Sequence, residues 1–447
     1  MAALKMEDKS WVIKVNEDVS KLSEITGAEK RNWELHSIYK LPACVTDLNK
    51  NAYKPRAISF GPYHYGDPKL YPMEAHKHRA LLHFLKKSRK PLDFYVCELN
   101  SVVRYLKDAY DSLDDKWEHD SEAFVQLMIR DGCFMLEVLR ACSPNDSDGQ
   151  ATRAEDEGYA ENDPIFSNHG KLYMMPYIKR DMLMLENQLP MLLLNKLLSP
   201  DEQAMNDEDE YINRLILQFS FPSTPHKRLG RCKHVLDAYR KSLLWEDPDI
   251  PKFETRPYIG FSVGGDDIVP SAAQLHEAGI VIQRNTTGSL TDISFSHGIL
   301  RLPQIVVDDT SEPVFLNLIA FERFHVDAGN EVTSYISFMD DIIDNAKDVS
   351  LLHSREIIHN AIGSDKAVAQ LFNSLSKDIT LDPESHLIVV RKRANQYSKR
   401  HWNQWRANLI HNYFTSPWAI LSVIAAIFLF GLTIVQTVYT IGQYYQS

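Results

Sequence analysis

Residues 418–441 of this 447-residue chain form a run of 24 positions without a charged side chain, six residues from the C-terminus. As an α-helix this run spans about 36 Å, more than the roughly 30 Å hydrocarbon core of a bilayer. A buried helix of a soluble protein is rarely so long and so uniformly apolar. We therefore predict one transmembrane helix, with Trp418 and Ile441 at its ends, Ile427 and Gly431 within it, and a short tail at 442–447.

The charges before this run predict its orientation. No Asp, Glu, Lys or Arg follows Arg406, so the positive-inside rule places the main domain in the cytosol and the tail outside. Cations next to a membrane also attract anionic lipid, each contributing about 1 kcal/mol. We interpret residues 386–417 as a basic juxtamembrane helix that carries Arg391, Lys392, Arg393, Lys399, Arg400 and Arg406.

Two further features bear on the side of the membrane that the domain faces. The N-terminal residues MAALKMEDKSW contain no apolar stretch before a cleavage site, so we expect no signal peptide and a C-terminal tail anchor. Asn145 in NDS and Asn285 in NTT match the N-glycosylation pattern, which matters only if the domain is lumenal or extracellular. We favour the plasma membrane with a cytosolic domain; an outward-facing domain is the alternative.

The overall composition excludes some functions. A net charge of -11 argues against nucleic-acid binding, which needs clustered Lys and Arg. The five cysteines form no CxxC pair and are widely spaced, which argues against a disulfide framework or a zinc site and favours a reducing compartment. Apolar residues make up 44% of the chain and charged residues 24%, as in ordinary globular proteins.

The apolar spacing predicts a mainly α-helical fold. We expect a peripheral helical segment at 1–35 and a large globular domain at 36–385, interrupted by an acidic loop at 143–168. Five prolines between residues 36 and 72 exclude a long helix there and predict extended, turn-rich backbone.

Two segments of this domain carry more specific patterns. Residues 180–198, RDMLMLENQLPMLLLNKLL, are apolar almost all round, which predicts a buried helix that bends or restarts at Pro190. The segment from 271 to 309 predicts a helix that stops at Gly279, then a strand, then a small β-hairpin around the Ser-His-Gly turn of SFSHGILRL.

Two clusters invite a chemical interpretation that their geometry does not favour. The turn SFGPYHYG contains Tyr63, His64 and Tyr65 but lacks the glycine-rich helix start of a phosphate loop, so we interpret it as a rigid turn that packs aromatics. Among the nearby histidines, His76 and His83 share a helix face but lie about 10.5 Å apart along the axis. This distance is too long for both side chains to bind one metal ion. We predict no metal and no cofactor.

Four carboxylates in apolar surroundings are the best catalytic candidates: Asp131, Glu137, Asp181 and Glu186. Neither pair within one helix points the same way, so a general acid/base dyad would have to form between helices. The favoured interpretation is structural: they cap helices or accept buried hydrogen bonds from neighbours such as Arg180, Asn187 and Gln188. Alanine at Glu186 should then lower stability.

Eight specific motifs follow one another along the chain: IYKLPACV, AYKPRAISFGPYHYG, MEAHKHRAL, DGCFMLEVL, RDMLMLENQLP, AAQLHEAGI, GILRLPQIVVDD and NLIAFERFH. In this order they resemble the plant family called domain of unknown function 247, or UPF0481-type membrane proteins. The resemblance runs from about Ser37 to the end. It implies a plant protein with one C-terminal membrane helix and no established enzymatic activity or cofactor. Some grass members are linked to self-incompatibility as candidate pollen-side determinants with small secreted partners.

These observations predict a membrane-anchored recognition protein that is not an enzyme. Its expected partners are the lipid bilayer and one or more proteins, small secreted peptides among them. The alternatives are a membrane-tethered intracellular adaptor and a hydrolase that uses carboxylates, which Glu137 and Glu186 in one open cleft would support. The small-xxx-small spacing of Ser422 and Ala426 is too little to predict a dimer, so the oligomeric state stays open.

Overall fold

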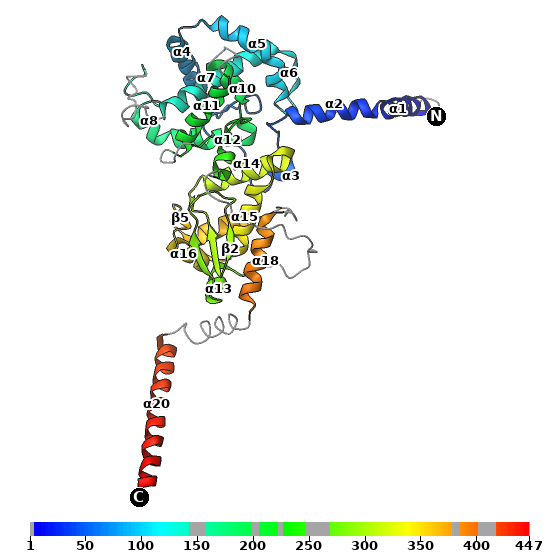
Figure 1. Cartoon of the computed structure of the whole chain (residues 1–447). Helices are drawn as coiled ribbons and strands as arrows, with labels where there is room; N and C mark the ends of the chain where they lie inside the picture. The colour runs from blue at the N-terminus through cyan, green and yellow to red at the C-terminus, as the bar shows by residue number, and fades with distance from the viewer. Residues whose placement is uncertain are drawn as a thin grey trace. The chain divides into compact units, whose positions relative to one another are not determined.

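The computed structural model describes residues 4–142, 158–198, 205–221, 227–246, 269–377, 379, 385–400 and 417–446. The chain divides into two compact units, and the globular domain expected at 36–385 includes parts of both. Unit 1 comprises Met1–Trp245 and Thr310–Val332, and unit 2 comprises Glu246–Asp309 and Thr333–Ser447. Figure 1 shows that helices dominate the described residues, as predicted, with a few short strands in unit 2.

Unit 1 is helical, and α7 (Ser121–Ala141) lies at its centre. Asp120 caps the helix by accepting a hydrogen bond from the Ala123 amide at 2.9 Å. α7 is buried on nearly all sides and packs against α4 (Pro72–Ser88), α5 (Leu92–Asp108) and α10 (Met191–Leu198). Gly132 permits the contact with α10, because a Cβ there would lie 2.5 Å from Leu197 Cδ1. The other helices of unit 1 are α1 (Leu4–Ser20), α2 (Leu22–Leu35), α3 (Ala43–Thr46), α6 (Asp115–His119), α8 (Asn168–Tyr173), α9 (Met175–Met182), η1 (Leu185–Asn187), α11 (Met205–Ser220), α12 (Val235–Leu244), α14 (Ser311–Phe324) and η3 (Val326–Ala328).

The proline-rich segment 36–72 is extended and turn-rich, as its prolines predict. Its longest helix before Pro72 is the four-residue α3, and Pro72 itself opens α4, where a missing N–H costs nothing. Ile38, Ile58 and Phe60 are fully buried. The segment therefore runs through the core of unit 1, where backbone N–H groups outside regular structure need other partners.

The apolar segment 180–198 does not form one continuous helix. α9 ends at Met182, the short 3-10 helix η1 follows, and α10 starts at Met191 directly after Pro190. Gln188 has extended backbone, and its buried amide donates to the carbonyls of Met182 (2.6 Å) and Met184 (2.7 Å). The predicted restart at Pro190 is thus present, and a side-chain amide satisfies carbonyls where the helix stops.

Unit 2 contains the predicted hairpin, between β2 (Ser294–Ser296) and β3 (Ile299–Leu302). Its two-residue turn is His297–Gly298, and both residues have positive φ (51° and 79°), as a type I′ turn requires. β1 (Val281–Arg284), the predicted strand after Gly279, pairs with β3 in parallel. β4 (Ile305–Val307) and β5 (Ile358–Asn360) form a second, parallel pair that was not predicted. The helices are α13 (Ala272–Glu277), α15 (Glu331–Ile342), α16 (Ala346–Ser354), α17 (Asp365–Leu375) and α18 (His386–Ser398).

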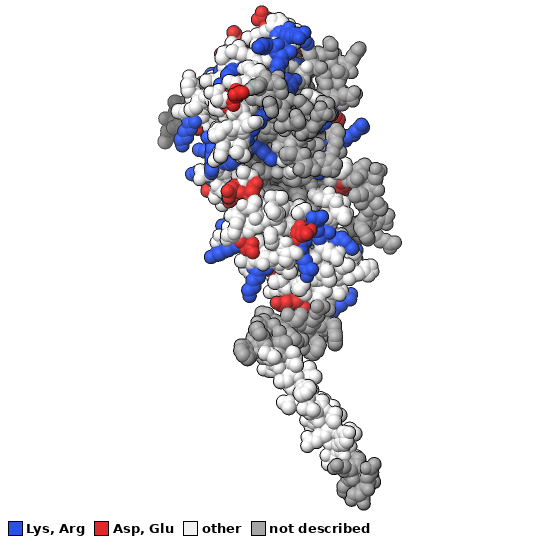
Figure 2. Space-filling view, turned by 90° about the vertical axis from the view of Figure 1, so that its left-hand side faces the viewer, with Lys and Arg blue, Asp and Glu red and all other residues white. Residues whose placement is uncertain are grey.

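The C-terminal helix α20 spans Pro417–Gln446. Among the described residues it is the one helix long and apolar enough to cross a membrane, over Ile424–Ile441, and none of that stretch is buried against the rest of the chain. In Figure 2 the described residues of α20 show no charged side chain, whereas other described parts of the chain carry acidic and basic residues. The predicted span thus lies within a single helix.

Candidate functional site

The four carboxylates singled out in the sequence hold the core of unit 1. Asp181 Oδ2 accepts hydrogen bonds from three consecutive backbone amides, those of Arg56 (2.9 Å), Ala57 (2.6 Å) and Ile58 (3.0 Å). Its Oδ1 lies 3.0 Å from the Arg180 guanidinium. Burial raises the pKa of Asp181, and these hydrogen bonds and Arg180 oppose the rise. Asp181 therefore fixes the backbone of the proline-rich segment.

Asp131 also holds the backbone of the proline-rich segment, at Gly61. It accepts from the Gly61 amide at 2.9 Å and pairs with the fully buried Lys77 at 2.8 Å. Lys77 also contacts Glu74 at 2.7 Å. Burial raises the pKa of Asp131, and Lys77 opposes the rise. This is a paired, buried charge network rather than a reactive group.

Glu137 and Glu186 have separate sets of partners. Glu137 pairs with Lys87 (2.7 Å) and accepts from the Tyr159 hydroxyl (3.0 Å). Glu186 accepts from the Leu41 amide (2.6 Å) and lies 3.2 Å from His64 Nε2. A hydrolase would be supported by both carboxylates in one open cleft. These contacts do not bring Glu137 and Glu186 together.

The aromatic turn and the nearby histidines also have structural partners. The Tyr63 hydroxyl donates to the carbonyl of Asp111, and Tyr65 packs edge-on against Trp117 with ring centroids 5.4 Å apart. His83 stacks on Tyr159 at 4.0 Å. Among the described residues no group of three His, Cys, Asp or Glu side chains is placed to hold a metal ion.

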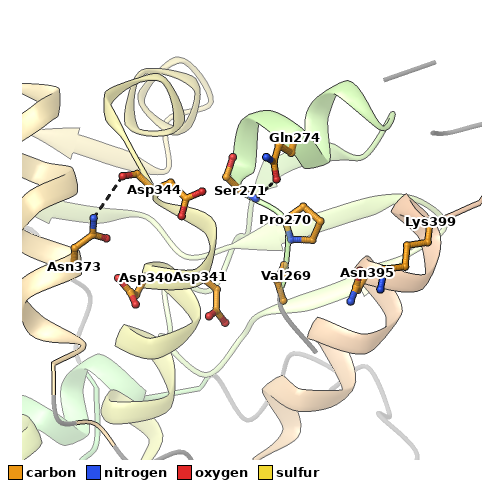
Figure 3. Close-up of a pocket in the computed structure, with 10 residues that line it drawn as sticks. All are labelled: Val269, Pro270, Ser271, Gln274, Asp340, Asp341, Asp344, Asn373, Asn395 and Lys399. Atoms are coloured by element: carbon orange, nitrogen blue, oxygen red, sulfur yellow. Dashed lines mark hydrogen bonds between the residues drawn. The ribbon is translucent and has the colours of Figure 1, made fainter. Parts of the chain in front are cut away.

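A cavity in unit 2 is the better candidate for a binding site (Figure 3). It has a volume of about 550 Å³ and polar side chains from four elements. Asp340 and Asp341 come from the last turn of α15, and Asp344 follows that helix. The remaining lining residues are Val269, Pro270, Ser271, Gln274, Asn373, Asn395 and Lys399.

Burial raises the pKa values of all three aspartates of this cavity, so their charged forms are disfavoured. Burial, together with Asp340 and Asp344, raises the pKa of Asp341 to about 6, although Arg391 lies 2.8 Å away and opposes the rise. The pKa of Asp344 is raised by burial and by Asp348 and Asp340. Carboxylates at the C-terminal end of a helix also face the negative end of its dipole. The sequence signal for this site is the run MDDIIDN, which our sequence analysis did not single out.

The predicted juxtamembrane cations divide into two groups. Arg391 is buried, 7% exposed, and its guanidinium bonds Asp341 (2.8 Å) and Ser337 Oγ (2.8 Å). It therefore cannot face lipid as predicted, because the apolar face of α18 carries it into unit 2. Lys392 is partly exposed, while Arg393, Lys399 and Arg400 are exposed; Arg406 lies outside the described residues.

The remaining predicted positions lie in α20 or at the glycosylation patterns. Trp418 and Gly431 lie in α20, and Ile427 and Ile441 are exposed there, 67% and 51%. Asn145 lies outside the described residues. Asn285 is buried, and its Nδ2 donates to the Asp292 carbonyl at 2.7 Å. That nitrogen is the one a glycan would occupy, so this geometry opposes modification of the folded protein.

Comparison with known proteins assigns the chain to a class. The family model DUF247, described as plant protein of unknown function, matches residues 38–432. The chain therefore belongs to this plant family. It is 30% identical to UPF0481 protein At3g47200 of Arabidopsis thaliana, over 91% of this chain and 86% of that protein. It is 22% identical to Putative UPF0481 protein At3g02645 of the same plant, over 97% and 94%. No solved structure matches significantly.

Proposed function

We propose that this chain is a membrane-anchored recognition protein that binds a basic segment of a protein partner in the acidic cavity of unit 2. The observation that carries the proposal is the set of carboxylates Asp340, Asp341 and Asp344 on the wall of an open cavity. Burial and the helix dipole disfavour their charges in the free protein. A bound cation offsets that penalty, so unit 2 is more stable with such a ligand than without it.

The cavity fits an arginine or lysine side chain better than a small apolar ligand. Its volume of about 550 Å³ holds one or two long side chains. Carboxylates accept the paired N–H groups of a guanidinium, and three of them line this cavity. A small basic peptide, secreted or intracellular, supplies such groups.

The absence of catalysis is part of the proposal. It is supported by the engagement of Asp131, Glu137, Asp181 and Glu186 with backbone amides and basic side chains. A general acid or base needs a position from which it can reach a substrate proton. These four carboxylates instead stabilise the packing of unit 1.

Titration of the full chain in detergent with a capped Arg-Gly-Arg peptide tests the proposal. Asp344→Asn should weaken binding about tenfold or more, since one charge-assisted hydrogen bond is removed. Glu356→Gln is the matched control, because Glu356 is an exposed carboxylate of the same unit, 76% exposed, that does not line the cavity. Binding that survives Asp344→Asn combined with Asp340→Asn would contradict the proposal, as would equal binding of a Glu-Gly-Glu peptide.

A further inference from the structure

Several polar and small residues of α20 share one face of the helix. From Ser422 onward these residues, together with Leu429, recur at alternating spacings of four and three residues, which is the spacing of a left-handed helix pair. At about 100° per residue they fall within an arc of about 80°. The positions on this polar face are Ser422, Ala426, Thr433, Gln436 and Thr440, with the apolar Leu429 among them, and the opposite face carries Ile424, Ile427, Gly431, Ile434 and Val438.

The threonines of α20 need no partner outside the helix. The Thr433 hydroxyl donates to the Leu429 carbonyl at 2.8 Å, Thr437 to Thr433 at 2.7 Å, and Thr440 to Gln436 at 2.8 Å. Such back-bonding leaves a hydroxyl satisfied within its own helix. The threonines alone therefore give no reason for the helix to associate.

Gln436 differs, because its side-chain amide has no hydrogen-bond partner within the described part of the chain. It lies five residues before Ile441, or about 7.5 Å along the axis, inside the apolar stretch Ile424–Ile441. An amide left unsatisfied in hydrocarbon carries a penalty, and its two methylenes are too short to reach water as a lysine side chain does.

We propose that α20 pairs in parallel with α20 of a second copy of this chain, with the two Gln436 amides hydrogen-bonded to each other. The inference rests on the proposed membrane anchoring. An amide has both donors and an acceptor, so two copies satisfy one another. A second copy in the same bilayer also presents its Gln436 at the same depth, and in a parallel left-handed pair each position of the polar face meets itself. No charged residue of α20 opposes the contact.

Energy transfer between full-length chains in phosphatidylcholine vesicles tests this pairing. Donor and acceptor dyes are attached at the N-terminus, and the protein-to-lipid ratio is varied. We expect transfer above that of random proximity for the wild type, and Gln436→Leu should weaken association about threefold to thirtyfold. Thr437→Val is the matched control: it removes a polar group next to Gln436 whose hydroxyl is already satisfied, and association should not change.

Two further readouts separate this inference from the proposed function. If the wild type does not float with the vesicles in a density gradient, the membrane anchor itself is wrong. If it floats but transfer stays at the random level, or Gln436→Leu has no effect, the pairing is overturned and the anchor stands. Oxidation of Thr433→Cys should give a dimer above the wild-type background, whereas Ile434→Cys on the opposite face should not. Equal cross-linking of both variants also overturns it.

Discussion

At the scale of single residues, Asp181 shows how a buried carboxylate can replace secondary structure. The segment 36–72 has too many prolines for a helix, yet it runs through the core, where its amides must be satisfied. One carboxylate oxygen accepts from three consecutive amides, and Asp131 and Glu186 satisfy those of Gly61 and Leu41. These acids are therefore structural residues.

Asp181→Asn should destabilise the protein by about 2–4 kcal/mol. An asparagine has one acceptor oxygen and turns an NH₂ donor toward other donors, and it leaves Arg180 without a charged partner. The measurement is urea unfolding of the full chain in detergent, followed by tryptophan fluorescence. Asp47→Asn, which loses only a surface pair with Lys50, should change stability by about 0.5 kcal/mol or less. Equal effects of the two substitutions would show that Asp181 does not hold the segment.

Asp341 makes the stability of unit 2 depend on pH. Its pKa is about 6 in the folded protein, against about 3.9 in an unfolded chain. Between these values the folded state binds the extra proton, so the contribution is complete below about pH 4 and lost as pH rises through 6. Asp341→Asn should remove up to about 3 kcal/mol of this pH dependence, measured as the difference in unfolding free energy between pH 4 and pH 7. Glu356→Gln should leave the dependence unchanged, and an unaltered slope in Asp341→Asn would contradict the assignment.

At the scale of elements, the turn of the β2–β3 hairpin makes a further prediction. Gly298 has φ +79°, and a Cβ there would lie 2.7 Å from the Tyr397 hydroxyl of α18. Gly288 has φ +68° with nothing within 4 Å of its Cβ position. Both alanine variants carry the cost of a positive φ, about 1–2 kcal/mol, but Gly298→Ala also displaces Tyr397. Its melting temperature should therefore fall further than that of Gly288→Ala; equal losses would show that the contact with α18 is unimportant.

The elements also show which features the sequence predicts and which it does not. Three features are local and can be predicted from a short stretch of sequence. Alternating apolar residues indicate the hairpin, the length of the apolar run indicates the α20 span, and a proline indicates the interruption at Pro190. The parallel pair β4–β5 joins residues about fifty positions apart, and no local pattern encodes that register. The prediction that Arg391 faces lipid was wrong for the same reason. The sequence shows its charge, but Asp341, the partner that holds it inside unit 2, lies on another helix. The cavity is lined by residues from four separate elements, so no local sequence pattern predicts it.

At the scale of the whole molecule, the proposed membrane anchor determines on which side of the membrane the proposed binding cavity of unit 2 lies. We propose that the domain faces the cytosol, because the cations Arg393, Lys399 and Arg400 are exposed before α20. Cys44 and Cys97 are exposed free thiols, which fits a reducing compartment. In this topology the proposed partner would be an intracellular protein and the chain a tethered adaptor; the opposite topology would require an outward-facing cavity and a secreted partner.

Protease protection decides between these two topologies. The full chain with an N-terminal tag is expressed in plant protoplasts, and protease is added before and after the plasma membrane is opened. The charges around α20 predict that the tag is cut only after opening, and that glycosidase leaves the mobility unchanged. Removal of residues 417–447 should release the protein from the membrane fraction, since the described residues contain no other helix that could span it. A tag cut on intact cells would reverse the topology; a glycan would then be expected at Asn145 and not at the buried Asn285, whose Nδ2 is already hydrogen-bonded to Asp292.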